Sequence, residues 1–301
     1  MSEKNSTSET EQPISQSAPE PEQPVAVKTL KPKFPNVGDL FAMLGIFLVA
    51  NVIAMLLALA FGFPFLAKDG VPVPPAMLGK TMAFISLVLY SVTFAGILIY
   101  RRLRGGQVRI ARFSRRGLNP ILLLWGVVFM LSTGVVAEPL LHLLPAPPLE
   151  SLGRGIWTML TVVVVAPVFE ELICRGVVLE SLRSRYGVVV AWFASSLFFA
   201  VMHGHPMLVV NAFFLGLVLA FIYLKSDSLY AVMILHGVNN ALSYLLMISG
   251  HGNVMLSDFV GSQTLYLLIY AGALTVCAAS GYMVYQTLVR LKEEEKKKEV
   301  A

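Results

Sequence analysis

The chain has 301 residues, of which 56% are hydrophobic and only 14% are charged, and its mean hydropathy is +0.72. Because soluble domains average about 25% charged residues, this composition excludes a disordered chain and disfavours a soluble enzyme. The net charge of +5 is compatible with nucleic-acid binding, but membrane proteins also carry excess basic residues in their cytoplasmic loops. The positions of the basic residues therefore decide between these interpretations.

Residues 1–35 form a region of their own. Glu, Ser, Thr, Gln and Pro dominate it up to Pro24, and large apolar side chains are almost absent. Such a segment cannot bury enough surface to offset its ordering entropy, which predicts a disordered tail. The tail lacks the basic start and the apolar stretch of a signal peptide.

The apolar runs that follow predict an all-α, polytopic membrane protein with about eight transmembrane helices, because about 20 apolar residues cross a bilayer core. The expected spans are residues 39–63, 78–100, 119–144, 155–182, 187–203, 207–225, 228–249 and 264–290. Cys174 and Cys277 lie inside these runs without a CxxC motif, and we interpret them as small buried residues rather than as disulfide partners or metal ligands.

The basic residues give the expected orientation. With an even number of spans and a cytoplasmic N-terminus, every flanking Lys and Arg lies inside except Lys68, Lys80 and Arg154. This asymmetry predicts an integral, multi-pass membrane protein with both termini cytoplasmic. It also accounts for the basic charge without a nucleic-acid partner. We expect the arginine-rich loop 101–116 to lie on the anionic inner leaflet.

Ionisable side chains inside a span are candidates for function, because a charge in lipid is costly. Glu170, Glu171 and Arg175 lie together in the fourth run. Glu171 and Arg175 are four residues apart on one helix face and are expected to pair. Glu170 is rotated by about 100° from Glu171, so it stays available for chemistry. Pro167 leaves the Val163 carbonyl without its helical partner and is expected to bend the helix.

Two further polar clusters occur in later runs. Phe199 and His203 share a helix face at the end of the fifth run, and His236 and Asn240 share one in the seventh, whereas Asn239 is expected to point elsewhere. Together with a carboxylate, these groups can supply a general base, proton carriers and an oxyanion donor. An interfacial histidine and interhelical hydrogen bonds are the alternative interpretations. Convergence requires that the seventh helix starts deeper, or that the helices tilt or stagger.

Three motifs occur in chain order: EExxxR at 170–175, FxxxH at 199–203 and HxxxN at 236–240. This set resembles the CPBP family (CAAX protease and bacteriocin-processing, or Abi) of intramembrane endopeptidases, over about residues 155–250. The resemblance implies hydrolysis of a peptide bond in a lipidated or membrane-embedded peptide substrate. It assigns the base to Glu170, water polarisation to His203, oxyanion donation to His236 and Asn240, and support to Glu171, Arg175 and Phe199.

The resemblance leaves the role of a metal open. A glutamate-activated water without a cofactor is expected, and a zinc ion held by Glu170, His203 and His236 is the alternative. Because Asn240 is a poor zinc ligand, the motif favours the metal-free site. Neither an HExxH zinc motif nor a GxSxG serine motif is present.

The expected organisation is a disordered cytoplasmic tail, N-terminal transmembrane helices, a CPBP catalytic core, a last transmembrane helix and a charged cytoplasmic tail, at residues 1–35, 36–154, 155–250, 251–290 and 291–301. Two other functions stay open: an ion-coupled transporter in which Glu170 and Glu171 carry protons, and a non-catalytic membrane adaptor or bacteriocin-immunity protein. No second span with paired glutamates matches the fourth run, which disfavours a transporter built from repeats.

Overall fold

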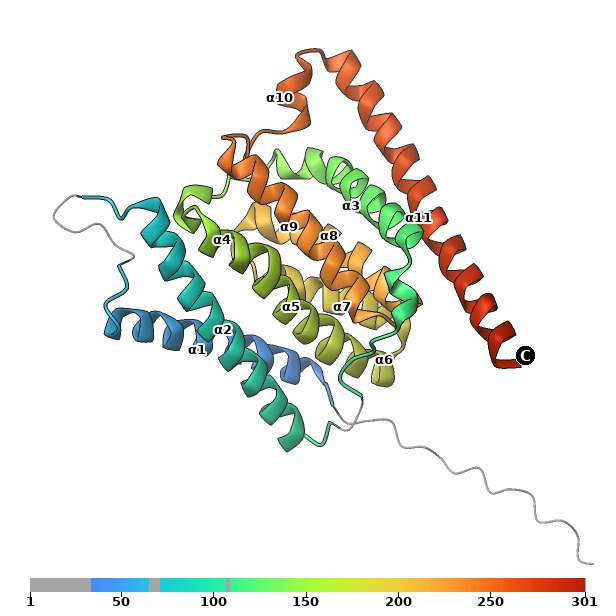
Figure 1. Cartoon of the computed structure of the whole chain (residues 1–301), viewed down its shortest axis with the longest axis horizontal. Coiled ribbons are helices and arrows are strands. Elements are labelled where there is room, and N and C mark those ends of the chain that lie inside the picture. The colour runs from blue at the N-terminus through green and yellow to red at the C-terminus, as the bar shows by residue number, and fades with distance from the viewer. Residues whose placement is uncertain (1–33, 65–70, 107–108, 301) are drawn as a thin grey trace, which may run out of the picture. The chain divides into compact units, whose positions relative to one another are not determined.

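The computed structural model describes residues 34–64, 71–106 and 109–300. In this part of the chain every element is helical, apart from an isolated bridge between Phe113 and Ser228, so the predicted all-α class is confirmed (Figure 1). The longer helices are α1 (Val37–Ala60), α2 (Pro75–Leu103), α3 (Pro120–Leu141), α7 (Val188–Val201), α8 (Pro206–Ser226), α9 (Leu229–Ile248) and α11 (Gln263–Val300). The short ones are η1 (Arg115–Leu118), η2 (Leu149–Leu152) and α10 (Leu256–Val260). The predicted disordered tail falls almost entirely on residues 1–33, which lie outside the described residues.

Residues 156–186 form one continuous helix, called here the composite helix, in which α-helical and π-helical segments alternate. Its segments are α4 (Ile156–Leu160), η3 (Thr161–Val165), α5 (Ala166–Glu171), η4 (Leu172–Leu179) and α6 (Glu180–Tyr186), with η3 and η4 π-helical. π-helical turns inside α-helices are rare and occur frequently at functional sites. The buried apolar side chains of the composite helix, α7, α8 and α9 form one shared core.

Six helices of the described part are long and apolar enough to cross a membrane: α1, α2, α3, α8, α9 and α11. The predicted count of eight is therefore confirmed for six spans. The run 155–182 lies in the composite helix, which its π-segments divide. The run 187–203 is wrong as a full span, because α7 has 14 residues and rises only about 21 Å against a hydrocarbon core of about 30 Å.

Asp39 fastens the start of α1 to the end of α2. It forms a capping box with Asn36, with backbone-to-side-chain distances of 2.7 and 2.8 Å. Its other oxygen accepts hydrogen bonds from Tyr100 and Arg104, both at 2.8 Å. Because the first turn of α1 meets the last turn of α2, the two helices run antiparallel. On the opposite side of the bundle, α11 lies along α3 (Figure 1).

The basic loop packs on protein over part of its length, and the expectation that it lies on the inner leaflet stays a prediction. The backbone N–H of Ser114 donates to the Asp227 carbonyl at 3.0 Å, and that of Leu229 donates to the Arg112 carbonyl at 2.8 Å. Ser228 and Leu229 are consequently fully buried. The seventh expected helix therefore begins packed against this loop rather than at an exposed turn.

Glu180 lies at the centre of an ion cluster that joins this loop to the composite helix and to the turn between α8 and α9. It is 3% exposed, lies 3.1 Å from Arg112 and 3.7 Å from Arg183, and accepts a hydrogen bond from the Tyr223 hydroxyl at 2.9 Å. Asp227 also pairs with both arginines, at 3.3 and 3.4 Å. We call Arg112, Glu180, Arg183 and Asp227 the basal ion cluster.

We predict that Glu180→Ala destabilises the fold by about 2–3 kcal/mol, because it removes the buried acceptor shared by two arginines and the Tyr223 hydroxyl and leaves the arginines with Asp227 alone. This loss is below the value for a fully buried pair, since the Arg112 side chain is partly exposed. Thermal unfolding in detergent measures it. Asp227→Asn is the control and is expected to cost less, because Asp227 is more exposed. Equal melting of Glu180→Ala and the wild type would contradict the assignment.

Candidate active site

Pro167 interrupts the hydrogen-bond ladder of the composite helix between its two π-helical segments. Having no N–H, it cannot bond to the Val163 carbonyl in an α-helical pattern or to the Val162 carbonyl in a π-helical one. The side-chain amide of Asn240, on α9, donates to the Val162 carbonyl at 2.9 Å. A Cβ added to Gly237 would lie only 2.9 Å from the Val163 oxygen, so α9 approaches the composite helix closely. On α9, Gly237 thus allows the two helices to approach, and Asn240 supplies the hydrogen bond that Pro167 cannot donate.

The expected pair of Glu171 and Arg175 is present, with 2.9 Å between the carboxylate and the guanidinium and no exposure of either side chain. Arg175 also donates to the Gly216 carbonyl of α8 at 3.0 Å, and it lies 4.7 Å from the centroid of the Phe199 ring on α7. A buried charge is tolerated only when it is paired and hydrogen-bonded. These contacts therefore hold the composite helix, α7 and α8 together around one charge pair.

His236 lies between the two carboxylates. Its Nδ1 atom is 2.9 Å from Glu171, and its Nε2 atom is 3.6 Å from Glu170. Because an ionised carboxylate only accepts hydrogen bonds, the Nδ1 atom carries the proton that faces Glu171. The Nε2 atom is thereby turned towards Glu170. The side chain is 1% exposed, so both carboxylates meet this imidazole away from water.

The Tyr90 hydroxyl, on α2, donates a hydrogen bond to Glu170, which is 8% exposed. The Tyr90 ring stacks on Phe169 with 5.8 Å between the centroids, and Phe94 contacts Phe169 edge-on. Sequence reasoning did not find Tyr90. The available signal was weak: a tyrosine inside an apolar span needs a partner for its hydroxyl, but nothing local identifies that partner.

The rings of the two motif histidines both contact the ring of one phenylalanine, Phe199. Phe199 lies 4.8 Å from the ring of His203 and 5.4 Å from that of His236, both edge-on. The Nδ1 atom of His203 is 3.0 Å from the Phe199 carbonyl. A carbonyl only accepts, so this nitrogen carries the proton and the Nε2 atom of His203 is left for other partners.

The three residues proposed as zinc ligands in the alternative mechanism do not form a preformed metal site. In the part of the chain that the structure describes, no three His, Cys, Asp or Glu side chains lie close enough together to hold a metal ion. Glu170 and His236 are neighbours, whereas the hydrogen bond of His203 stays within α7. The expectation of a metal-free site stays a prediction.

The side chain of Asn239 contacts that of its neighbour Asn240. Its side-chain amide lies 3.3 Å from the Asn240 oxygen and donates to it. Asn240 is thus held at both ends, because its own amide group is bound to the Val162 carbonyl. One N–H of Asn240 remains for a further acceptor.

Comparison with known proteins identifies the segment that carries all three motifs. Residues 152–242 match the family model described as Rce1-like, type II CAAX prenyl endopeptidase. These residues belong to the Rce1-like family of CPBP proteases. The predicted resemblance is therefore confirmed over this segment, and together with the six apolar helices it supports an integral membrane protein. The chain matches none of the curated proteins and none of the solved structures with which it was compared.

We predict that Glu171→Ala and Arg175→Ala each destabilise the protein by about 3–5 kcal/mol, because either change leaves a buried charge without its partner. Glu170→Ala is the matched comparison and is expected to cost only about 1–2 kcal/mol, since it strands the neutral Tyr90 hydroxyl. Melting temperatures in detergent distinguish the two classes. If all three variants melt alike, this division between the two adjacent glutamates is wrong.

We predict that Tyr90→Phe lowers the rate of peptide cleavage by roughly tenfold, because it removes a donor to Glu170 worth about 1.5 kcal/mol while it keeps the ring on Phe169. The control is Tyr100→Phe, which removes a hydroxyl bonded to Asp39 at the far end of the same helix. That variant is expected to lose stability but to keep its rate once folded. An unchanged rate for Tyr90→Phe would remove Tyr90 from the site.

Proposed function

We propose that the chain is an intramembrane endopeptidase in which Glu170 activates the water that attacks a peptide bond. The observation that carries this proposal is the unequal pairing of two adjacent buried carboxylates. Glu171 is neutralised by Arg175, whereas the described contacts of Glu170 are with Tyr90 and His236 only. A buried carboxylate without a fixed cationic partner is suited to exchanging a proton.

Charge balance supports a shared proton between Glu170 and His236. Two carboxylates and one guanidinium leave one uncompensated negative charge in a buried cluster, which is costly. A proton on His236 makes the cluster neutral and keeps Glu170 ionised. In that state Glu170 acts as the base and the Nε2–H of His236 acts as a donor.

The reaction then proceeds in two steps. A water attacks the peptide carbonyl carbon and gives its proton to Glu170, while the oxyanion accepts hydrogen bonds from His236 and from the remaining N–H of Asn240. Glu170 next donates that proton to the leaving nitrogen as the carbon–nitrogen bond breaks. His203 is proposed to polarise the water through its Nε2 atom, which its bond to Phe199 leaves free.

We further propose a membrane-associated, lipidated peptide as the substrate, with the bilayer as the surface on which enzyme and substrate meet. The description of the matching family as prenyl endopeptidases supports this class. The orientation proposed for the chain has both termini in the cytoplasm, which the distribution of the basic residues supports.

We predict that Glu170→Gln reduces cleavage of a farnesylated C-a-a-X peptide at least about 10²-fold in detergent, because it keeps the volume of the side chain but removes the base. Glu295→Gln changes a carboxylate outside the site and serves as the control. Cleavage is followed by mass spectrometry with and without a chelator, which is expected to leave the rate unchanged. Near wild-type turnover by Glu170→Gln would favour a non-catalytic role. Recovery of a chelated, inactive sample by zinc alone would overturn the metal-free mechanism.

A further inference from the structure

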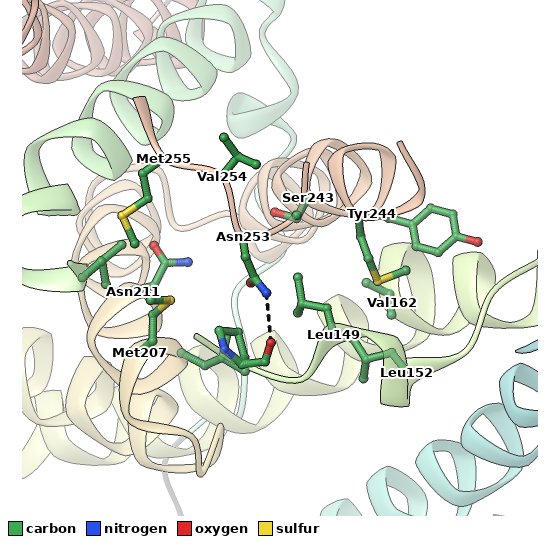
Figure 2. Close-up of a pocket in the computed structure, with 15 residues that line it drawn as sticks. Leu149, Leu152, Val162, Met207, Asn211, Ser243, Tyr244, Asn253, Val254 and Met255 are labelled. Atoms are coloured by element: carbon green, nitrogen blue, oxygen red, sulfur yellow. Dashed lines mark hydrogen bonds between the residues drawn. The ribbon is translucent and has the colours of Figure 1, made fainter. Parts of the chain in front are cut away.

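The hydroxyl of Tyr244, on α9, binds both backbone groups of Gly155, the N-cap residue of the composite helix. The Gly155 N–H donates to the hydroxyl oxygen at 3.0 Å, and the hydroxyl donates to the Gly155 carbonyl at 3.0 Å. Tyr244 is 7% exposed, so water competes little for these bonds. Tyr244 and Val162 both line the pocket drawn in Figure 2, where the tyrosine ring extends away from the centre of that pocket. The hydroxyl is therefore directed at the start of the composite helix.

The start of the composite helix has no capping side chain of its own. The first N–H groups of a helix lack partners inside the helix, and a Ser, Thr, Asp or Asn at the N-cap normally accepts from one of them. Gly155 occupies this position with φ +104°, a backbone conformation that glycine adopts without strain. The orientation of its peptide groups is instead fixed by the hydroxyl of Tyr244, so the start of this helix depends on α9.

The same end of the composite helix is also held by α2. The Arg154 N–H donates to the Pro75 carbonyl at 3.0 Å, and a Cβ added to Gly153 would lie only 2.7 Å from the oxygen of that carbonyl. Both α2 and α9 also contribute side chains to the candidate active site. The composite helix is thus held by the same two neighbours at its start and at its two buried glutamates.

The stretch between these two sets of contacts is the irregular part of the composite helix. It contains the π-helical segment η3 and Pro167, where the regular hydrogen-bond ladder is interrupted. Because backbone bonds are missing there, the ladder alone does not fix the distance of Glu170 from Gly155 along the helix. Contacts with neighbouring helices at both ends of the stretch are needed to define it.

Three side chains of α9, spaced four residues apart on one helix face, all bind the composite helix. They are His236, Asn240 and Tyr244, whose partners are Glu171, the Val162 carbonyl and Gly155. The partners follow in the opposite chain order, so the two helices run antiparallel and these bonds set their axial register. A displacement of about 1 Å in a positioned group can cost about 10²-fold in rate, so this register bears on catalysis.

We propose that Tyr244 is a positioning residue, which holds the start of the composite helix in register with α9 and thereby aligns Asn240 with Glu170. The proposal rests on the endopeptidase function proposed above. Tyr244 lies outside the three motifs and beyond the matched segment 152–242. Its bonds are to the backbone of Gly155, so it acts on the reaction through the placement of other groups.

The test is steady-state cleavage of a farnesylated C-a-a-X peptide by the full-length protein in detergent. Tyr244→Phe removes the hydroxyl and keeps the ring, and we expect kcat to fall about tenfold while KM changes by less than about twofold. Tyr270→Phe is the matched control, because the Tyr270 hydroxyl also donates to a backbone carbonyl of another helix, that of Val136 at 3.2 Å. This control is expected to keep the wild-type kcat.

A double-mutant cycle separates positioning from a merely structural role. Asn240→Ala alone removes a donor to the oxyanion and is expected to lower kcat by about 10²–10³-fold. Because Tyr244 is proposed to act through Asn240, adding Tyr244→Phe to this variant is expected to lower kcat no further, within about twofold. A merely structural role would instead give independent losses that multiply.

A second variant and a measurement without turnover cover the case in which Tyr244→Phe folds poorly. Gly155→Ala keeps the tyrosine but disfavours the backbone conformation that its hydroxyl binds, and it is expected to lower kcat to a similar extent. Hydrogen exchange of the Gly155 amide, followed by mass spectrometry, is expected to be about tenfold faster in Tyr244→Phe than in the wild type, because one hydrogen bond is lost. It is expected to be unchanged in Tyr270→Phe.

The outcomes distinguish this proposal from the proposed function. A wild-type protein that cuts no peptide overturns the endopeptidase function, and the positioning role with it. A wild-type protein that cuts overturns the positioning role alone if kcat is unchanged in Tyr244→Phe and Gly155→Ala, if the losses multiply in the cycle, or if exchange of the Gly155 amide is unchanged. A fall in kcat at constant KM that disappears in the Asn240→Ala background supports the role.

Discussion

The buried pair of Glu171 and Arg175 is the interaction on which the arrangement of the core depends. Arg175 is fully buried and binds Glu171 on its own helix, the Gly216 carbonyl on α8 and the Phe199 ring on α7. Glu171 in turn holds His236 of α9. In a medium of low dielectric constant these charges persist only while each contact is made, so one pair orients four helical elements at once.

Close approach of the helices is what allows these short contacts. A Cβ added to Gly216 would meet Ser196 and Phe199 at 3.2 and 3.3 Å, and one added to Gly237 would meet the Val163 carbonyl. Small residues at helix contacts are the usual means by which membrane helices pack, because lipid supplies no hydrophobic force between them. The close approach at Gly237 also has a chemical consequence. It brings Asn240 of α9 near enough to bind the Val162 carbonyl, which Pro167 leaves free.

Polar groups are arranged in order along the composite helix. The basal ion cluster lies at its α6 end, and the two glutamates of the candidate active site lie near its middle. Charges of the basal cluster are partly exposed and fasten loops, whereas those of the middle are buried and few. The ionic contacts that fasten loops therefore lie at one end of the helix, apart from the buried charges of the candidate active site.

The sequence by itself determined the helical class, most of the membrane helices and the pairing of Glu171 with Arg175, because long apolar runs and a spacing of four residues are local properties. The motifs also predicted the family whose model matches residues 152–242. Only the tertiary structure decided that Tyr90 contacts Glu170 and that Asn240 binds the Val162 carbonyl. Those outcomes depend on how helices from distant parts of the chain pack. The π-helical turns belong with them, because a proline predicts a break in a helix but not which carbonyl a neighbouring helix will bind.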